Sequence, residues 1–293
     1  MPTLLDFRRR IRSVKSSQQI TRAMKFVAAA RLRRAQEAAL AARPYAKELA
    51  RVLRSTMARI ESPQHPLLAR RPEERILLMV LSGERGLAGA FNTNVLKQAH
   101  EFIRSKKGKK IVLIPIGKKG RDSLRKTGFQ FAAEYVNVLA RVDYKVAREI
   151  AKLVSELYAK DEIDAVYVVF SEFKNVMAPT LVVDKLLPVE EVKEGTETET
   201  SAVPAPVQVD YIYEQPEQQI LDRLLPRYIE TQILRVMLES CAAEYAARMT
   251  AMEAATRNAG EVIDALTLHM NKVRQAAITK EIIEIVSGAA STA

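Results

Sequence analysis

Residues 238–266 decide the fold and read LESCAAEYAARMTAMEAATRNAGEVIDAL. Apolar or small side chains recur every three or four positions between Leu238 and Leu266, which is the spacing of one face of a long helix. The same spacing extends in both directions, from Leu234 to Ile283. The polar members of the series are Arg248, His269 and Lys280. We therefore predict one long helix over the C-terminal part of the chain.

The N-terminal part carries the same spacing from Leu4 to Leu53, interrupted only by Gln18, Thr21 and Lys25. At a rise of 1.5 Å per residue each helix would be roughly 75–90 Å long, well beyond the ~30 Å of a small domain. We predict that the two helices pair as an antiparallel coiled coil, a shaft, because the residues between them return the chain to the same place. Ordinary amphipathic helices of a bundle are the alternative. Frequent alanine, which lets two helix axes approach closely, favours the pair.

Two residues within these helices, Pro44 and Cys241, lead to separate predictions. Pro44 lacks the backbone donor of a helical residue, so it should kink or restart the first helix. Cys241 is the only cysteine and occupies a position of the apolar series. We expect a buried small residue there rather than a nucleophile.

The positive charge is concentrated in the first helix. The whole chain has a net charge of +11, whereas residues 1–60 alone hold 15 Lys and Arg against 3 Asp and Glu. Such a helix suits nucleic acid, an anionic membrane surface or an acidic protein partner, and a merely solvated basic face stays open. Because Phe7, Phe26 and Tyr45 are isolated and form no aromatic platform, we expect no nucleic acid as a partner.

The middle of the chain alternates between strand-like and helix-like segments. The expected strands are 75–82, 110–116, 131–138, 165–173 and 180–187, and the expected helices are 92–105, 118–126 and 143–160. Continuous apolar strands alternating with helices are typical of a largely parallel sheet covered on both faces.

The domain organisation follows from these segments. We predict a Rossmann-like α/β head domain over residues 73–214, flanked by shaft helices at 1–62 and 216–288. Within the head, residues 190–206 are acidic, Thr-rich and punctuated by Pro, which predicts a flexible loop. Residues 209–213 are predicted to be a short edge strand.

No catalytic or ligand-binding constellation is recognisable. Gly83, Gly86 and Gly89 follow the first strand, but their spacing differs from the G-x-G-x-x-G of dinucleotide-binding turns, so a tight turn is the better interpretation. The three histidines lack metal-ligand spacing. We expect no catalytic residue, cofactor or metal. A basic nucleic-acid binder would show steeply salt-dependent DNA affinity, and an α/β enzyme with a coiled-coil arm would bind nucleotide saturably.

Separated motifs of the chain resemble the γ subunits of F-type ATP synthases. They are QITRAMKFVAAARLRRA at 19–35, SGERGLAGAFN at 82–92, ESCAAEYAARMTAMEAATRNAG at 239–260 and NKVRQAAITKEIIEIVSGAA at 271–290. Ala88 stands where many members have cysteine. The resemblance implies a rotor shaft of the central stalk that transmits proton-driven rotation of the c-ring to the catalytic β subunits for ATP synthesis, and the reverse during hydrolysis. It implies no catalysis by the chain itself.

The resemblance also implies roles for individual residues. The positions that match contacts with β are Met24, Lys25, Arg274, Gln275, Thr279 and Glu281. The positions that match a tip turning in an apolar bearing are Ile282, Ile283, Ile285 and Val286. The positions that match the contact with the c-ring and ε are Tyr211 and Glu214.

The implied partners are a hexameric ring of α and β subunits, the ε subunit and the c-ring. No run of the chain approaches the ~20 apolar residues of a membrane span, and its start lacks an apolar signal core. We therefore expect a peripheral protein at the cytoplasmic face of a bacterial inner membrane, associated with it only through the complex. The coupling ion, H⁺ or Na⁺, stays open.

Overall fold

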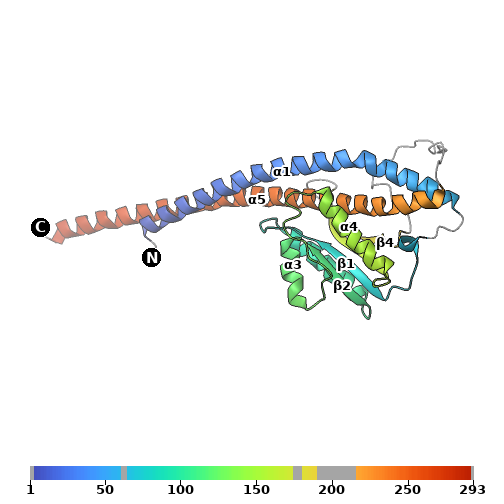
Figure 1. The fold of residues 1–293 in the computed structure, drawn as a ribbon. Helices are drawn as coiled ribbons and strands as arrows, with labels where there is room; N and C mark the ends of the chain where they lie inside the picture. The colour runs from blue at the N-terminus through green and yellow to red at the C-terminus, as the bar shows by residue number, and fades with distance from the viewer. Residues whose placement is uncertain (1–2, 61–64, 174–179, 190–215, 292–293) are drawn as a thin grey trace, which may run out of the picture. The chain divides into compact units, whose positions relative to one another are not determined.

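The computed structural model describes residues 3–60, 65–173, 180–189 and 216–291 (Figure 1). Its elements in chain order are α1 (Leu4–Arg59), η1 (Pro66–Leu68), β1 (Arg75–Leu81), α2 (Phe91–Ser105), β2 (Lys110–Ile116), α3 (Lys118–Leu124), η2 (Arg125–Thr127), α4 (Tyr144–Ala159), β3 (Ala165–Glu172), β4 (Thr180–Leu187) and α5 (Glu217–Ser291). They group into two compact units. One contains α1 up to Ala29 and α5 from Arg248, and the other spans residues 30–247.

A mixed four-stranded sheet forms the centre of the larger unit. Its strand order is β2-β1-β3-β4, with β1 parallel to β2 and β3, and with β4 antiparallel to β3. The predicted fold class, long antiparallel terminal helices plus a Rossmann-like α/β domain, is confirmed. The predicted loop 190–206 and edge strand 209–213 lie outside the described residues.

The strand predicted at residues 131–138 is wrong. Only two isolated bridges form there, Leu113 with Phe131 and Ile116 with Tyr135. The amide of Leu113 in β2 donates to Gln130, and the amide of Gly117, just after β2, donates to Tyr135, but Pro115 between them has no amide to donate. A continuous ladder is therefore impossible. The predicted helix at 118–126 is also shorter, because α3 ends at Leu124 and a 3₁₀ turn follows.

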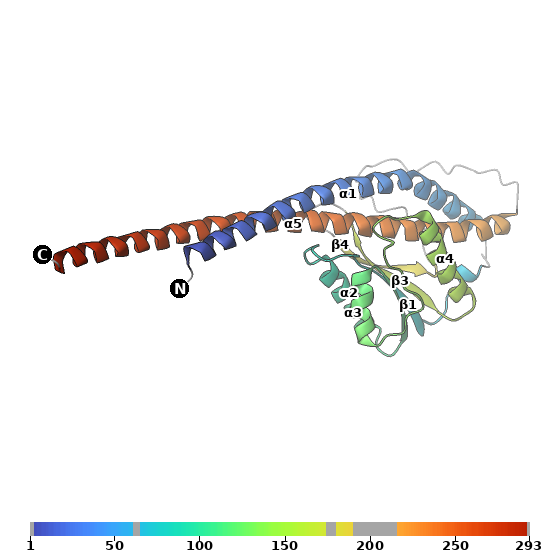
Figure 2. The ribbon, with the colours of Figure 1, turned by 60° about the vertical axis from the view of Figure 1, so that its left-hand side comes forward.

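The sheet is covered on both faces, and alternate residues of β1 point to opposite sides. Leu78 and Val80 pack with α2 and α3, whereas Leu77, Met79 and Leu81 pack with α4, α5 and the end of α1. Figure 2 shows α2 and α3 in front of the strands. Burial on both faces explains why the strands read as continuous apolar runs.

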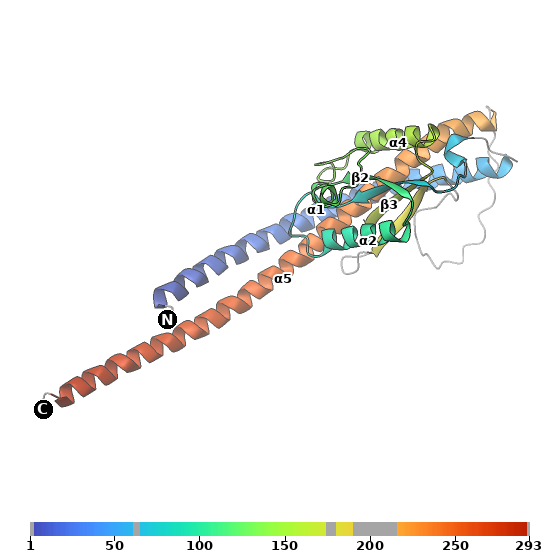
Figure 3. The same ribbon diagram turned by 90° about the horizontal axis from the view of Figure 1, so that it is seen from below.

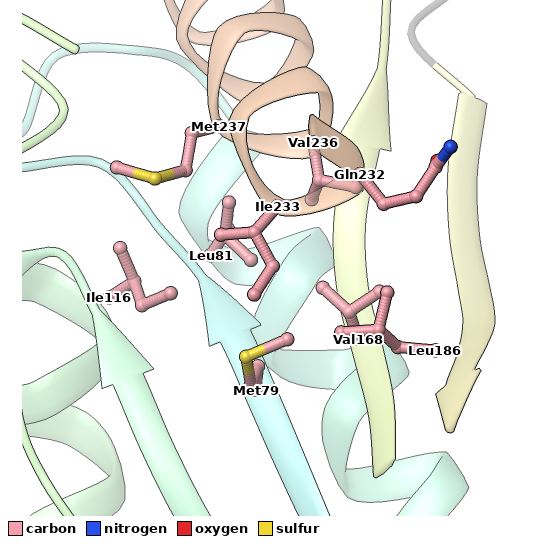
Figure 4. Close-up of a pocket in the computed structure, with 9 residues that line it drawn as sticks. All are labelled: Met79, Leu81, Ile116, Val168, Leu186, Gln232, Ile233, Val236 and Met237. Atoms are coloured by element: carbon pink, nitrogen blue, oxygen red, sulfur yellow. The ribbon is translucent and has the colours of Figure 1, made fainter. Parts of the chain in front are cut away.

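The contact between α5 and the sheet is tightly filled. Figure 4 shows Ile233 of α5 pointing toward Met79, and Met237 of the same helix extending on the side of Ile116. The gap that remains among these side chains is about 10 Å³, close to the size of one water molecule. This interface therefore leaves no room for a small-molecule ligand.

The two long helices continue through internal prolines. α1 runs through Pro44, and Figure 1 shows its ribbon bending in its second half, as the missing backbone donor leads one to expect. α5 likewise contains Pro226 near its start, which the periodicity alone did not single out.

In the smaller unit the helix ends pair in antiparallel orientation. Phe7 stacks on His269 with ring centroids 5.1 Å apart, and Thr21 Oγ1 lies 2.8 Å from Thr256 Oγ1. Residue numbers on α5 therefore fall as those on α1 rise. All of the predicted seam residues of α1 are buried or half-buried.

On α5 the predicted seam is wrong in part beyond Ala259, although Leu266 and Val273 are half-buried as predicted and His269 packs on Phe7. Five expected members are exposed, namely Val262, His269, Ala276, Lys280 and Ile283. Ile263, Met270 and Ala277 are half-buried instead, one position later. A Cβ on Gly260 would lie 3.2 Å from Gln18 Nε2, so Gly260 faces α1. The next half-buried residue is Ile263, four positions after Ala259, whereas the heptad count expected Val262, three positions after it.

Glu73 gives the larger unit a pH-dependent stability. Burial alone would raise the pKa of this carboxyl, but hydrogen bonds from Lys106, Tyr167 and Lys185 lower it from 4.5 to about 2. Because the folded pKa is depressed, this contribution is present above about pH 4.5 and is lost as the pH falls toward about 2.

We expect Glu73→Gln to lower the free energy of unfolding at pH 7 by about 1 kcal/mol, since the carboxylate is partly exposed and screened. The difference from the wild type should shrink as the pH falls from 5 to 3. Urea unfolding of both proteins across this range measures it, and a difference that stays constant with pH would contradict the assignment.

Candidate interaction surface on the paired helices

A polar layer crosses the otherwise apolar seam between α1 and α5. Lys25 Nζ donates to Glu253 Oε1 at 2.6 Å, and Gln18 Nε2 donates to the carbonyl oxygen of Thr256 at 3.3 Å. Thr21 Oγ1 meets Thr256 Oγ1 within the same layer. Polar pairs within an apolar seam fix the register of two helices, because any shift would leave them unmatched.

The Lys25–Glu253 pair is open to solvent, since 33% of the Lys25 side chain and 57% of the Glu253 side chain are exposed. The hydrogen bond from Lys25 lowers the pKa of Glu253. An exposed pair of this kind contributes little to stability, because water screens it. Glu253 therefore holds the ammonium of Lys25 in place without removing it from the surface. The sequence pattern alone did not identify Glu253.

Large apolar side chains lie exposed on α1 near Lys25. Ile20, Phe26 and Val27 are 57%, 61% and 54% exposed. They fall outside the heptad positions, which is the signal by which the sequence could have revealed them. Together with half-buried Met24, they give this part of α1 a mixed apolar and basic surface of the kind that protein partners cover.

The predicted contacts on α5 form a second, separate region. Its members are all exposed and are Arg274, Gln275, Thr279 and Glu281. Thr279 Oγ1 donates back to the carbonyl oxygen of Gln275 at 2.9 Å. Arg274 is 21 positions beyond Glu253, which corresponds to about 30 Å along a helix. The structure therefore does not bring the two predicted groups of β contacts together.

The end of α5 extends beyond the start of α1 in the smaller unit, as Figure 3 shows. Residues 278–287 are all exposed. The predicted tip residues Ile282, Ile283, Ile285 and Val286 are 55–71% exposed. A single helix with apolar side chains open to water is a surface that calls for a covering partner.

Tyr211 and Glu214, the predicted contacts with the c-ring and ε, lie outside the described residues. Their role stays a prediction.

The glycine turn after β1 is filled by side chains of the chain itself. The amide of Gly83 donates to Asn92 Oδ1 at 2.8 Å, and a Cβ on Gly83 would lie 2.9 Å from Glu244 Cδ. Glu84 accepts from the amide of Lys118 at 3.0 Å. Two carboxylates against the turn disfavour a bound phosphate and support the interpretation as a structural turn. Leu87 in this turn has φ of 63° and an exposed side chain, a strained position that sequence reasoning missed.

The described residues contain no group of three or more His, Cys, Asp or Glu placed to hold a metal ion. Cys241 is buried as predicted, and burial raises the pKa of its thiol to about 12. Within the same residues, every helix is too short or too polar to span a membrane.

Known proteins match this chain over nearly its whole length. The family model described as ATP synthase matches residues 3–292. The ATP synthase gamma chain of Solibacter usitatus is 50% identical over 295 residues, which cover 99% of both chains. That of Pelotomaculum thermopropionicum is 47% identical over 291 residues, again covering 99% of both.

Solved structures agree on the fold. A chain in the cryo-EM structure of the Euglena gracilis mitochondrial ATP synthase (OSCP, F1 and c-ring) superposes with a TM-score of 0.66 at 18% identity, covering 99% of this chain and 94% of that one. Since the curated relatives match end to end at close to half identity, this chain belongs to the family of ATP synthase gamma chains.

Proposed function

We propose that this chain is the central-stalk rotor subunit of an F-type ATP synthase. It transmits c-ring rotation to the catalytic β subunits during synthesis and carries rotation back to the ring during hydrolysis. The chain performs no chemistry of its own. The observation that carries the proposal is the exposed surface of the helix pair, where apolar side chains on α1 and on the end of α5 lie open to water in a member of this family.

The helix pair is suited to work inside a ring of subunits. Its two sides differ, because Lys25 with its apolar neighbours lies on α1 and the Arg274 group lies on α5. The two groups are also about 30 Å apart along the axis. A partner at a fixed position therefore meets different side chains at different shaft angles. Contacts available at one angle only favour one conformation of that partner, which is a population shift driven by rotation.

The charged residues act as angle-dependent contacts in this proposal. Lys25 faces an acidic segment of β, and the guanidinium of Arg274 binds a carboxylate of a second β loop. Gln275, Thr279 and Glu281 complete that second contact. Ile282, Ile283, Ile285 and Val286 turn in an apolar collar, where few directional hydrogen bonds would resist rotation.

The larger unit carries the contacts with the other rotor subunits. Tyr211 and Glu214 contact the c-ring and ε. The head domain spans residues 73–214, and the shaft helices span residues 1–62 and 216–288. The chain lies at the cytoplasmic face of a bacterial inner membrane and is held there by the complex.

Co-assembly with α and β subunits tests the proposal. The α and β subunits of a close relative would be purified without their own γ and mixed with the full chain. We expect a ring of alternating subunits around one asymmetric central density by single-particle imaging, together with a rise in ATP hydrolysis. Rings that exclude the chain, with hydrolysis unchanged, would refute it.

A matched variant sharpens this test. Replacement of the four tip residues Ile282, Ile283, Ile285 and Val286 by Ser leaves the contacts of α1 intact, because none of the four is buried. We expect the variant to have the circular dichroism of the wild type and to be retained less firmly in the ring. Identical retention would show that the tip is not held by an apolar collar.

A further inference from the structure

The edge of the sheet at which the parallel strands begin is strongly basic. β1, β2 and β3 run in the same direction, so their starts lie at one edge, together with the ends of α2 and α4. Ten Lys and Arg gather there against five Asp and Glu. The cations are Arg70, Arg71, Arg75, Arg104, Lys106, Lys107, Lys109, Lys110, Lys160 and Lys185. The acids are Glu73, Glu74, Asp161, Glu162 and Asp164. We call this set the basic edge.

Ion pairs occupy most of the acids and leave cations in excess. Asp164 pairs with Arg75, Asp161 with Arg71, Glu74 with Lys109, and Glu73 with both Lys106 and Lys185. Among the described residues, five exposed cations of the basic edge have no ion-pair partner. They are Arg70, Arg104, Lys107, Lys110 and Lys160.

The unpaired cations are concentrated at the turn between α2 and β2. Arg104, Lys107 and Lys110 are exposed around Gly108, whose φ of +92° makes the turn tight. Lys side chains near the end of α2 complement its dipole, as does Lys160 at the C-cap of α4. That effect falls off within the last turn and does not account for Lys110 in β2.

We propose that the basic edge binds the anionic phospholipid headgroups of a membrane surface. Each Lys or Arg near an anionic membrane contributes attraction that corresponds to about a fivefold gain in affinity. The absence of an apolar anchor favours lipid over a protein partner, because none of the exposed large apolar residues of the described chain lies at this edge. Protein interfaces are built around an apolar centre, whereas headgroup binding requires charge alone.

The proposal is independent of the rotor role, since it concerns the free chain and a lipid surface. It departs from the expectation that the chain is associated with the membrane only through the complex. Two competitors are present in the chain itself. The basic residues of α1 can also attract anionic lipid. Residues 190–206 contain five Glu and one Lys, so their negative charge competes with anionic lipid for the basic residues.

A probe at the edge separates these cases. Cys241 is buried, so a thiol introduced by Ser105→Cys can be labelled selectively with a fluorophore. A second chain carries the label through Arg85→Cys, in the turn at the opposite end of β1, roughly 20 Å away for a strand of this length. Vesicles of phosphatidylglycerol and phosphatidylcholine, with a spin-labelled headgroup as quencher, are compared with vesicles of phosphatidylcholine alone.

We expect quenching of the label at 105, not of that at 85, and only with the anionic vesicles. Lys107→Glu with Lys110→Glu should weaken binding about tenfold or more. The control is Lys118→Glu with Lys119→Glu, which changes the net charge equally at the opposite edge, where both side chains are exposed; it should have less than half that effect on a logarithmic scale.

Three results would overturn the proposal. Equal quenching at both labels, or equal weakening by both double variants, would assign the binding to α1 or to net charge. Quenching at 105 that is absent from the full chain and appears only after residues 190–206 are replaced by a Gly-Ser linker would show that the intact chain does not bind lipid through this edge.

Discussion

Gly117→Ala is expected to destabilise the larger unit by about 3 kcal/mol or more. A Cβ at this position would lie 2.0 Å from the carbonyl oxygen of Ser82, and the φ of Gly117 is +105°. Neither contact partner can move freely, because the amide of Ser82 donates to Ile116 and the amide of Gly117 donates to Tyr135. The backbone joining β2 to α3 would have to shift. Chemical unfolding followed by far-UV circular dichroism measures the loss.

Gly128→Ala is the matched control for this prediction. Gly128 also has a positive φ, +76°, but a Cβ there would meet nothing within 4 Å. Its substitution should cost about 1–2 kcal/mol, the strain of a left-handed conformation alone. Equal losses in the two variants would show that the close approach to Ser82 does not matter.

Lys25→Glu is expected to lower proton-driven ATP synthesis by the assembled complex about tenfold or more, which corresponds to one lost charge-assisted hydrogen bond. The reversed charge would face the acidic segment of β in the proposed assembly and would also face Glu253 within the chain. The stability of the isolated chain should change little, because the pair is exposed and screened by water. Synthesis in reconstituted vesicles and thermal unfolding of the chain measure the two effects.

The exchange of both charges separates coupling from folding. Lys25→Glu with Glu253→Lys restores an ion pair inside the chain, so its stability should return to that of the wild type. Synthesis should stay low, because position 25 still presents the wrong charge to β. Recovery of synthesis in the exchanged variant would show that the intrachain pair, and not a contact with β, is what matters at Lys25.

Arg274→Glu provides a second arm of this experiment. Arg274 is exposed and, within the described part of the chain, has no ion-pair partner, so its reversal leaves the chain's own contacts unchanged. We expect reduced synthesis with normal assembly. Parallel loss of assembly and synthesis would contradict a specific role in coupling.

The sequence predicted the elements that depend on local pattern and missed those that depend on a partner strand or helix. The apolar runs of β1 and β3 and the long series in α1 and α5 were sufficient to place these elements. The expected strand at 131–138 failed because its partner edge contains Pro115, which is invisible when the segment is read alone.

In the candidate site, too, the sequence revealed what depends on local pattern and missed what depends on a partner helix. Lys25 stood out because it interrupts an apolar series, whereas Glu253 did not, since an exposed acid on a helix surface is ordinary until its partner is known. Beyond Ala259 the prediction failed at single positions such as Val262, which is exposed while Ile263 is half-buried; both are apolar, and only packing against α1 distinguishes them. The ordinary spacing rule could not decide between them.

Direct observation of rotation tests the rotor assignment most directly. The full chain, labelled through Ser105→Cys and assembled with α and β subunits fixed to a surface, would carry a bead on the thiol. We expect stepwise rotation in one direction that starts on addition of ATP and stops when ATP is removed. A bead that stays fixed while the same complexes hydrolyse ATP would contradict it.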